Sequence, residues 1–227
     1  MREIILDTET TGLDPKSGHR VIEIACVEMV DRSLTGNIFH HYFNPQRAIP
    51  AEATAIHGIT DDFVKDMPTF KMVAQDFFNF VDGAQIVAHN AEFDAKFLDM
   101  ELLQAGFRTI DRTKVIDTLV LARRTYPGSA NSLDALCARF KIDQSHREKH
   151  GALIDTMLLA EVYIELMGGR QKAFELPSKQ KVKKIISATN LIAKPFYDRP
   201  TNITEEQFEA HSTYIQRNLK ATFWPSA

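Results

Sequence analysis

The sequence predicts an α/β layer fold with a mixed sheet of about five strands, flanked by helices and followed by a C-terminal extension. Two observations lead to this prediction. Three strand-like segments come first, and helical and strand-like segments then alternate as far as residue 169. A short turn joins the second and third strands whereas helices separate the later ones, so antiparallel and parallel pairs should share one sheet.

Apolar runs bounded by turn residues predict the first three strands, at 3–8, 21–30 and 37–45. The second run, VIEIACVEMV, carries two glutamates among its apolar residues. The connection DRSLTG over 31–36 is short and turn-like, which favours a hairpin between the second and third strands. We expect a loop over the next segment, which contains AIPAEATAIHGIT.

Helices and short strands alternate in the rest of this block. TFKMVAQDFFNFVDG predicts a helix that ends at Gly83, and QIVAHN predicts a short buried strand over 85–90. AEFDAKFLDMELLQAG predicts a second helix, and KVIDTLVLARRTY predicts a short strand that leads into a third. NSLDALCARF predicts a helix with Ser132 as its N-cap. HGALIDTMLLAEVYIELMGG predicts a last long helix, which the glycine pair terminates.

The extension divides into a linker and a short helix. Residues 170–203 begin with the basic stretch RQKAFELPSKQKVKK, which has no sustained periodicity and contains a proline, so a flexible linker is expected. Within 204–227, Thr204 and Gln207 have the spacing of a capping box. Apolar residues that can form one helical stripe follow, namely Phe208, Ile215 and Leu219. The predicted organisation is therefore a domain over 1–169, a linker over 170–203 and a terminal segment over 204–227.

The composition fits an ordinary soluble globular protein. Of the 227 residues, 44% are hydrophobic and 25% are charged, and no run of about 18 apolar residues predicts a membrane span. The N-terminal stretch MREIILDTET does not resemble a signal peptide, because acids follow an apolar run of three residues. Cys26 and Cys137 are far apart and lack zinc-site spacing, which favours a reducing, cytoplasmic location.

The net charge limits the kinds of nucleic-acid binding that the chain could perform. A formal charge of −3 disfavours a protein that coats long duplex DNA through its own charge. It leaves open an enzyme that holds a few nucleotides at a strand end, or a subunit that a partner brings to its substrate.

Two acids lie on one face of the first predicted strand. In IILDTETTGLDP, Asp7 and Glu9 are two residues apart, which places their side chains on the same face, roughly 7 Å apart. Like charges so placed repel unless a positive charge lies between them. A bound divalent cation would supply that charge, although this stretch alone also fits a solvated strand end that runs into a turn.

Three further residues strengthen the metal-site hypothesis. Asp94 follows the strand over 85–90 at the start of a helix, where open α/β sheets place ligand sites. His150 and Asp155 are five residues apart, which is about 140° on a helix, so both cannot point the same way if both are helical. The polar stretch QSHREKH favours His150 on the loop before the helix and Asp155 in its first turns, facing the sheet.

The order DxE, then D, then HxxxxD resembles the DEDDh, or DnaQ-like, 3′–5′ exonucleases of the ribonuclease H-like superfamily. DTETTGLDP, IHGIT, AHNAEFD, NSLDALCARF and HGALIDTMLLAEVY extend the resemblance over about residues 2–169, within that family, to the proofreading subunits of bacterial replicative DNA polymerases. The resemblance implies a ribonuclease H-like fold and hydrolysis of mispaired 3′-terminal nucleotides to nucleoside 5′-monophosphates.

The same resemblance implies a role for each matching residue. Two divalent cations, Mg²⁺ or Mn²⁺, would be bound by the carboxylates, and His150 would be the general base. The implied metal ligands are Asp7, Glu9, Asp94 and Asp155. Glu52 and His57 match positions that contact the terminal nucleotide at a DNA 3′ end, and Glu9 and Asp155 are implied to contact it as well. The backbone at Gly12 could also approach the terminal sugar, because glycine lacks a side chain.

Two other functions remain open at this level. A stand-alone DEDDh exonuclease that acts on RNA or single-stranded DNA would have the same site, and the C-terminal extension argues against it. An inactive ribonuclease H-like binding module would not need the intact set of four acids and a histidine.

The extension suggests protein partners. The terminal segment has too few apolar residues to form its own core. It could fold back on the domain, but the preferred expectation is that it docks on the polymerase catalytic (α) subunit. Its expected anchors are Phe208, Ile215, Leu219 and Trp224. In RQKAFEL, Gln171 and Phe174 are candidate contacts for the sliding clamp.

Overall fold

The structure, a computed structural model, describes residues 1–145, 149–169, 204–206, 209–210 and 213. The chain divides into a first compact unit, 1–175, and a second unit, 176–227. The predicted linker over 170–203 and its residues Gln171 and Phe174 lie outside the described residues. In the described part of the chain, no helix is both long enough and apolar enough to cross a membrane.

The first unit is built on one mixed sheet of five strands, in the order β3-β2-β1-β4-β5. The strands are β1 (Arg2–Thr10), β2 (Val21–Val30), β3 (Ser33–Tyr42), β4 (Gln85–Ala88) and β5 (Val115–Asp117). The first three form antiparallel pairs, whereas β4 is parallel to both β1 and β5. The predicted fold class is therefore confirmed, with β1 at the centre of the sheet.

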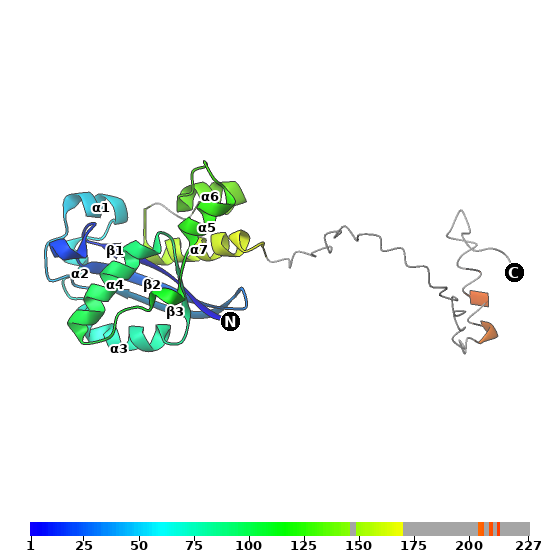
Figure 1. Ribbon diagram of the computed structural model, residues 1–227, viewed down its shortest axis with the longest axis horizontal. Coiled ribbons are helices and arrows are strands. Elements are labelled where there is room, and N and C mark those ends of the chain that lie inside the picture. The colour runs from blue at the N-terminus through cyan, green and yellow to red at the C-terminus, as the bar shows by residue number, and fades with distance from the viewer. Residues whose placement is uncertain (146–148, 170–203, 207–208, 211–212, 214–227) are drawn as a thin grey trace, which may run out of the picture. The chain divides into compact units, whose positions relative to one another are not determined.

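Helices cover both faces of this sheet (Figure 1). They are α1 (Ala51–His57), α2 (Asp61–Val64), α3 (Phe70–Val81), α4 (Ala91–Ala105), α5 (Thr118–Thr125), α6 (Leu133–Phe140) and α7 (Ala152–Leu166), with 3₁₀ turns at Pro15–Ser17 and Arg112–Lys114. Apolar residues of α3 and α4 pack against one face of β1, and α7 packs against the other. The sheet core is thus closed on both sides.

The alternation of side chains along β1 assigns each residue to one of these two layers. Ile4 and Leu6 belong to the core with α3 and α4, whereas Ile5 packs with α7. On the α7 face, the Tyr163 hydroxyl donates a hydrogen bond to Glu3 over 2.7 Å. Asp7 and Glu9 have the same parity as Ile5, so the strand directs them toward the α7 side.

The structure corrects several predicted boundaries. β1 extends to Thr10 rather than residue 8, because it pairs with β2 along its whole length. The hairpin turn is only Asp31-Arg32, both with positive φ, so β3 begins inside the segment predicted as a turn. The predicted loop over AIPAEATAIHGIT contains α1 and ends at Thr60, the N-cap of α2; α1 is too short to show clear periodicity.

Within the second unit, the described residues agree with a helix. Residues 205, 206, 209, 210 and 213 are helical, and Thr213 donates a hydrogen bond to the Glu209 carbonyl over 2.8 Å. The predicted stripe and anchor residues, Phe208, Ile215, Leu219 and Trp224, lie outside the described residues, as does Gln207 of the capping box.

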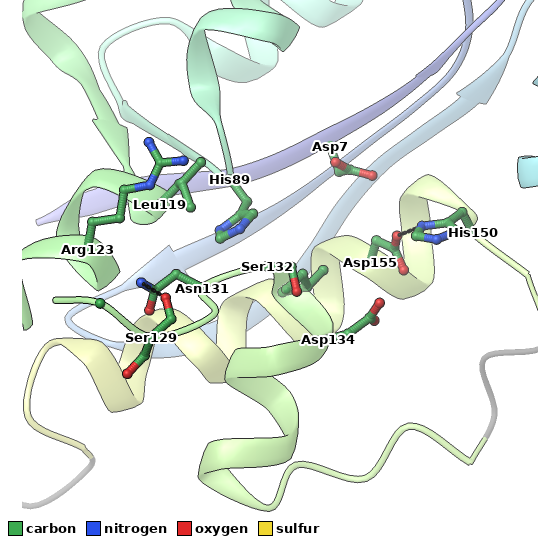
Figure 2. A pocket seen from close by; sticks show the side chains of 12 residues that line it. Asp7, His89, Leu119, Arg123, Ser129, Asn131, Ser132, Asp134, His150 and Asp155 are labelled. Carbon is green, nitrogen blue, oxygen red and sulfur yellow. Dashed lines mark hydrogen bonds and ion pairs between the residues drawn. The ribbon is translucent and has the colours of Figure 1, made fainter. Parts of the chain in front are cut away.

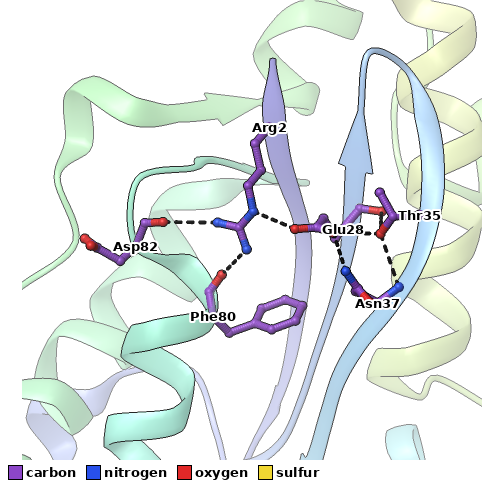
Figure 3. A network of polar contacts seen from close by, with 6 residues as sticks. All are labelled: Arg2, Glu28, Thr35, Asn37, Phe80 and Asp82. Atoms are coloured by element: carbon purple, nitrogen blue, oxygen red, sulfur yellow. Dashed lines mark hydrogen bonds and ion pairs between the residues drawn. The ribbon is translucent and has the colours of Figure 1, made fainter.

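Polar contacts join the start of β1 to β2 and to the end of α3 (Figure 3). The Arg2 guanidinium donates to Glu28 on β2 and to the carbonyls of Phe80 and Asp82 at the end of α3. Glu28 also accepts hydrogen bonds from Thr35 and Asn37 on β3. These bonds, from Arg2 first, hold the pKa of Glu28 at about 2, below its ordinary value of 4.5.

Glu28→Gln should destabilise the protein by about 1–3 kcal/mol at neutral pH, because charge-assisted hydrogen bonds are lost. Since the folded-state pKa of Glu28 is depressed, its contribution is present above about pH 4.5 and disappears as the pH falls toward 2. Urea unfolding at several pH values would test this. Substitution of the exposed Glu92 by Gln is the control. If the difference in unfolding free energy between Glu28→Gln and the parent protein stays the same in acid, the assignment is wrong.

Candidate active site

Four predicted acids converge near the C-terminal end of β1. Asp7 and Glu9 come from the strand itself, Asp94 from the first turn of α4 and Asp155 from the first turn of α7. Asp94 and Asp155 are 3% and 5% exposed, respectively. Ionised carboxylates are costly to bury without a compensating partner. The site therefore combines two buried acids, Asp94 and Asp155, with two partly exposed ones, Asp7 and Glu9.

Asp7 lies at the centre of this group. Burial raises its pKa well above the ordinary value, and the negative charges of Asp94, Glu9, Asp155 and Glu23 raise it further. A group surrounded by four other carboxylates cannot ionise cheaply unless a cation neutralises them. A bound metal ion would reverse this effect, because it is the largest local charge in such a site.

Asp94 is held by a short hydrogen bond across the end of the sheet. The Thr8 hydroxyl donates to its Oδ1 over 2.6 Å, and both side chains are buried. Burial raises the pKa of Asp94 to about 7, and the bond from Thr8 opposes that rise. The hydrogen bond from Thr8 thus fixes the orientation of the Asp94 carboxylate, which the neighbouring acids repel.

His150 lies on the loop before α7, as predicted. Its Nδ1 is 3.1 Å from Asp155 Oδ2, and its side chain is 48% exposed. One ligand atom from each of Glu9, His150 and Asp155 can be chosen so that all three lie within 4.8 Å of one another. The resemblance implied a base separate from the metal ligands, whereas the structure places the imidazole in contact with Asp155 and close to Glu9.

Glu23 is an acid of this site that the sequence analysis did not single out. It is buried on β2 opposite Glu9, and its Oε1 lies 2.8 Å from His40 Nε2. Its Oε2 accepts a hydrogen bond from the Ala152 amide over 3.1 Å, at the start of α7. Gly151, the N-cap of α7, makes no side-chain capping bond. Glu23 therefore anchors the helix that carries Asp155, and a glutamate within the apolar run VIEIA was the available signal.

Two cavities lie beside the acids. The larger, about 730 Å³, is lined by Asp7, Asp155 and His150 and also by residues of α5 and α6 (Figure 2). The smaller, about 500 Å³, is lined by Glu9, Glu52 and His57. The structure thus brings three of the four predicted nucleotide-contact residues, Glu9, Glu52 and His57, to one cavity, while Asp155 lines the other. Asp94 is not among the residues that line either one.

His57 presents an unused hydrogen-bond donor. The Ile59 amide donates to its Nδ1 over 3.0 Å, so in the neutral ring the proton is on Nε2. Within the described residues, Nε2 is buried and has no partner. Burial lowers the pKa of His57, which favours the neutral ring. An oxygen of a bound ligand would satisfy this donor.

Gly12 lies against the ring of His19. A Cβ at this position would lie 2.3–2.6 Å from atoms of the His19 ring. The ring therefore packs directly on the glycine, and both residues line the smaller cavity. The loop is anchored because Arg20 makes two 2.7 Å bonds to the buried Glu101 on α4.

The donor set fits a hard divalent cation. Asp7, Glu9, Asp94 and Asp155 offer carboxylate oxygens, the ligands that Mg²⁺ and Mn²⁺ prefer. Burial and the charges of the neighbouring acids raise the pKa of Asp7, so a cation bound at this site would relieve a repulsion that the acids impose on one another. The residues present therefore fit a metal site of the kind that the sequence predicts.

Comparison with known proteins gives the same family. Residues 4–163 match the family model described as Exonuclease (RNase_T). The chain is 46% identical to DNA polymerase III subunit epsilon of Rickettsia conorii over 235 residues, covering 98% of this chain and 99% of that one. It is 44% identical to the Escherichia coli subunit epsilon, covering 98% and 97% of the two chains.

Solved structures share the fold. Exonuclease X, in complex with 5′-overhanging duplex DNA, is 31% identical with a TM-score of 0.57, covering 73% of this chain and 90% of that one. The nuclease domain of 3′hExo, a DEDDh family member bound to rAMP, is 21% identical with a TM-score of 0.63, covering 73% and 91%. The chain therefore belongs to the exonuclease family, in the group formed by the DNA polymerase III epsilon subunits.

Proposed function

We propose that this chain is the proofreading 3′–5′ exonuclease subunit of a bacterial replicative DNA polymerase. The observation that carries this proposal is the buried group of carboxylates around Asp7, situated between two cavities. A DNA strand can place its 3′-terminal nucleoside in one cavity and its scissile phosphodiester beside the acids. The product is a nucleoside 5′-monophosphate. A cytoplasmic location follows from this role.

Asp7, Glu9, Asp94 and Asp155 are proposed to hold two divalent cations, Mg²⁺ or Mn²⁺. Bound there, the cations would lower the pKa of an attacking water and stabilise the negative charge that develops on the phosphate and the leaving oxygen. The protein's part is to keep four acids in place against their repulsion. Thr8 does this for Asp94, and Glu23 does it for the helix that carries Asp155.

His150 is proposed to accept the proton of the attacking water. Asp155 Oδ2 accepts a hydrogen bond from its Nδ1, which orients the ring toward the acids and assigns proton transfer to the other nitrogen. The half-exposed side chain can exchange that proton with solvent after each turnover. Its place on the loop before α7 also allows the ring to turn as substrate enters.

The smaller cavity is proposed to hold the terminal nucleoside. Glu52 would accept a hydrogen bond from a sugar hydroxyl, and His57 Nε2 would donate one to a nucleoside oxygen. The support is that both residues line this cavity with Glu9, and that the His57 donor has no partner within the described residues. Such contacts favour frayed or mismatched ends, because unpairing them costs less.

The division of the chain into 1–169, 170–203 and 204–227 is part of the proposal. The catalytic domain acts on a DNA 3′ terminus, and the terminal segment binds the polymerase catalytic subunit. Gln171 and Phe174 are proposed as a weaker contact for the sliding clamp. A tether of this type would raise the local concentration of the exonuclease at the primer end. Support comes from relatives named as polymerase subunits that align along nearly the whole chain.

A stand-alone exonuclease acting on RNA or single-stranded DNA is the alternative. Its site would be the same, and the alignment of the extension with polymerase subunits is the observation against it. Comparing hydrolysis of matched single-stranded DNA and RNA separates the two, since preferred cleavage of RNA and no binding to polymerase would support the alternative.

Asp7→Asn should abolish hydrolysis in Mg²⁺ or Mn²⁺, because a central ligand is lost. The metal-free variant should nevertheless unfold at a higher temperature than the parent near pH 8. The raised folded-state pKa of Asp7 means that its ionisation destabilises the fold increasingly as the pH rises above the ordinary value of 3.8. Thermal unfolding in a chelator, together with Mn²⁺ titration, would check both statements. Hydrolysis at the parental rate would exclude Asp7 as a ligand.

His150→Gln should lower kcat by roughly 10²–10⁴-fold, the usual effect of losing a general base. Mn²⁺ affinity should change little, because the carboxylates remain. Parallel measurement of kcat and Mn²⁺ binding is the test. A Mn²⁺ affinity that falls together with kcat would show instead that the imidazole is a ligand, as its position near Glu9 and Asp155 allows.

A chain that ends at Gly169 should digest a short single strand as well as the full chain does, because every proposed catalytic residue is retained. It should not bind the polymerase catalytic subunit in a pull-down. Undiminished binding by the truncated chain would place the polymerase contact on the catalytic domain and refute the role of residues 204–227.

A further inference from the structure

The larger cavity extends well beyond the acids. From Asp7, His150 and Asp155 it continues along α5 to the loop before α6, where Arg123 and Asn131 line it. Figure 2 shows Arg123 and His89 at one end of this groove and His150 and Asp155 at the other. The catalytic chemistry proposed above uses only the acidic end. The polar end requires a separate explanation.

Arg123 is the permanent cation among the described residues that line the groove. In that part of the chain, its exposed guanidinium has no hydrogen bond or ion pair. Basic residues are common in the last turn of a helix, where they interact with the helix dipole. Arg124 shares that position and is also exposed, but it does not line the groove. The helix end therefore does not account for the placement of Arg123.

The neighbouring His89 is held in place by a hydrogen bond to Thr118. Thr118 is fully buried, and its hydroxyl donates to the Ala88 carbonyl, so His89 Nδ1, 2.9 Å away, acts as the donor to Thr118. Burial lowers the pKa of His89, and the charge of Arg123 adds to this effect, whereas Asp117 and a hydrogen bond to the Asn131 backbone oppose it. The ring thus forms part of the groove wall at the end of β4, near the Arg123 guanidinium.

The five carboxylates repel an approaching nucleic-acid strand, which is itself a polyanion. A cation at the far end of the groove would offset this repulsion by attracting the strand's phosphates. If the terminal nucleoside occupies the smaller cavity and the scissile phosphate lies at the acids, the rest of the strand must leave through the larger groove. We propose that this groove binds the single strand on the 5′ side of the scissile phosphate, and that Arg123 pairs with a backbone phosphate there. This inference rests on the proposed exonuclease function.

The test measures kcat and KM of the full-length chain on two substrates. Thymidine 5′-(4-nitrophenyl phosphate) has no upstream phosphate, whereas an oligothymidylate has several. Arg123→Gln should raise KM for the oligonucleotide about tenfold, the worth of one charge-assisted hydrogen bond. The dependence of log KM on log salt concentration should weaken by about 0.7, as expected for one lost phosphate contact on a single strand. The kcat on both substrates and KM for the ester should stay at parental values.

Matched variants make the result specific. Arg124→Gln removes the same charge from the same helix end and should leave KM and its salt dependence unchanged, while Arg123→Lys should retain most of the salt dependence. The proposal is overturned if Arg123→Gln leaves the oligonucleotide KM unchanged, if it impairs the ester equally, or if Arg124→Gln has the same effect. Failure of the exonuclease proposal itself would look different, because the unaltered chain would then hydrolyse neither substrate.

Discussion

Mutual repulsion among buried carboxylates is the constraint on which the rest of this structure depends. Asp7 is crowded by Asp94, Glu9, Asp155 and Glu23, and burial adds to the cost of its charge. Only a rigid framework can hold such a group together. Its framework is β1, whose apolar residues are buried on both faces, with helices packed above and below. The energy that the apolar layers contribute maintains an arrangement that the acids alone would not adopt.

Individual contacts then adjust each acid. The hydroxyl of Thr8 holds Asp94 from the α4 side, and Glu23 holds the start of α7, which carries Asp155. Glu23 thereby has two effects: its charge adds to the repulsion around Asp7, and its hydrogen bond fixes one of the other acids. Such a residue is a positioning group, and replacing it would change the geometry of the site without removing a proposed ligand.

The two cavities follow from the same arrangement. The loop after β1 and helix α1 enclose the smaller one, where the His19 ring occupies the space that a side chain at Gly12 would need. Helices α5 and α6 enclose the larger one, which joins the acids to Arg123. A DNA strand whose 3′ end is bound across both cavities would cross the site in one direction. The polarity of hydrolysis would then be a property of the fold and not of any single residue.

The sequence by itself determined the mixed α/β sheet and most helices, because period and local spacing are encoded in neighbouring residues. Its resemblance to a known family predicted the roles of four acids and His150. The sequence placed Asp7 and Glu9 on one face, and β1 confirms that alternation. It did not predict α1, whose seven residues are too few for a periodic signal. Only the tertiary structure could bring Glu23 to Ala152 across 129 positions, pair His19 with Gly12, and set Arg123 in the groove that holds Asp155. These contacts depend on how strands and helices pack, which no local pattern records.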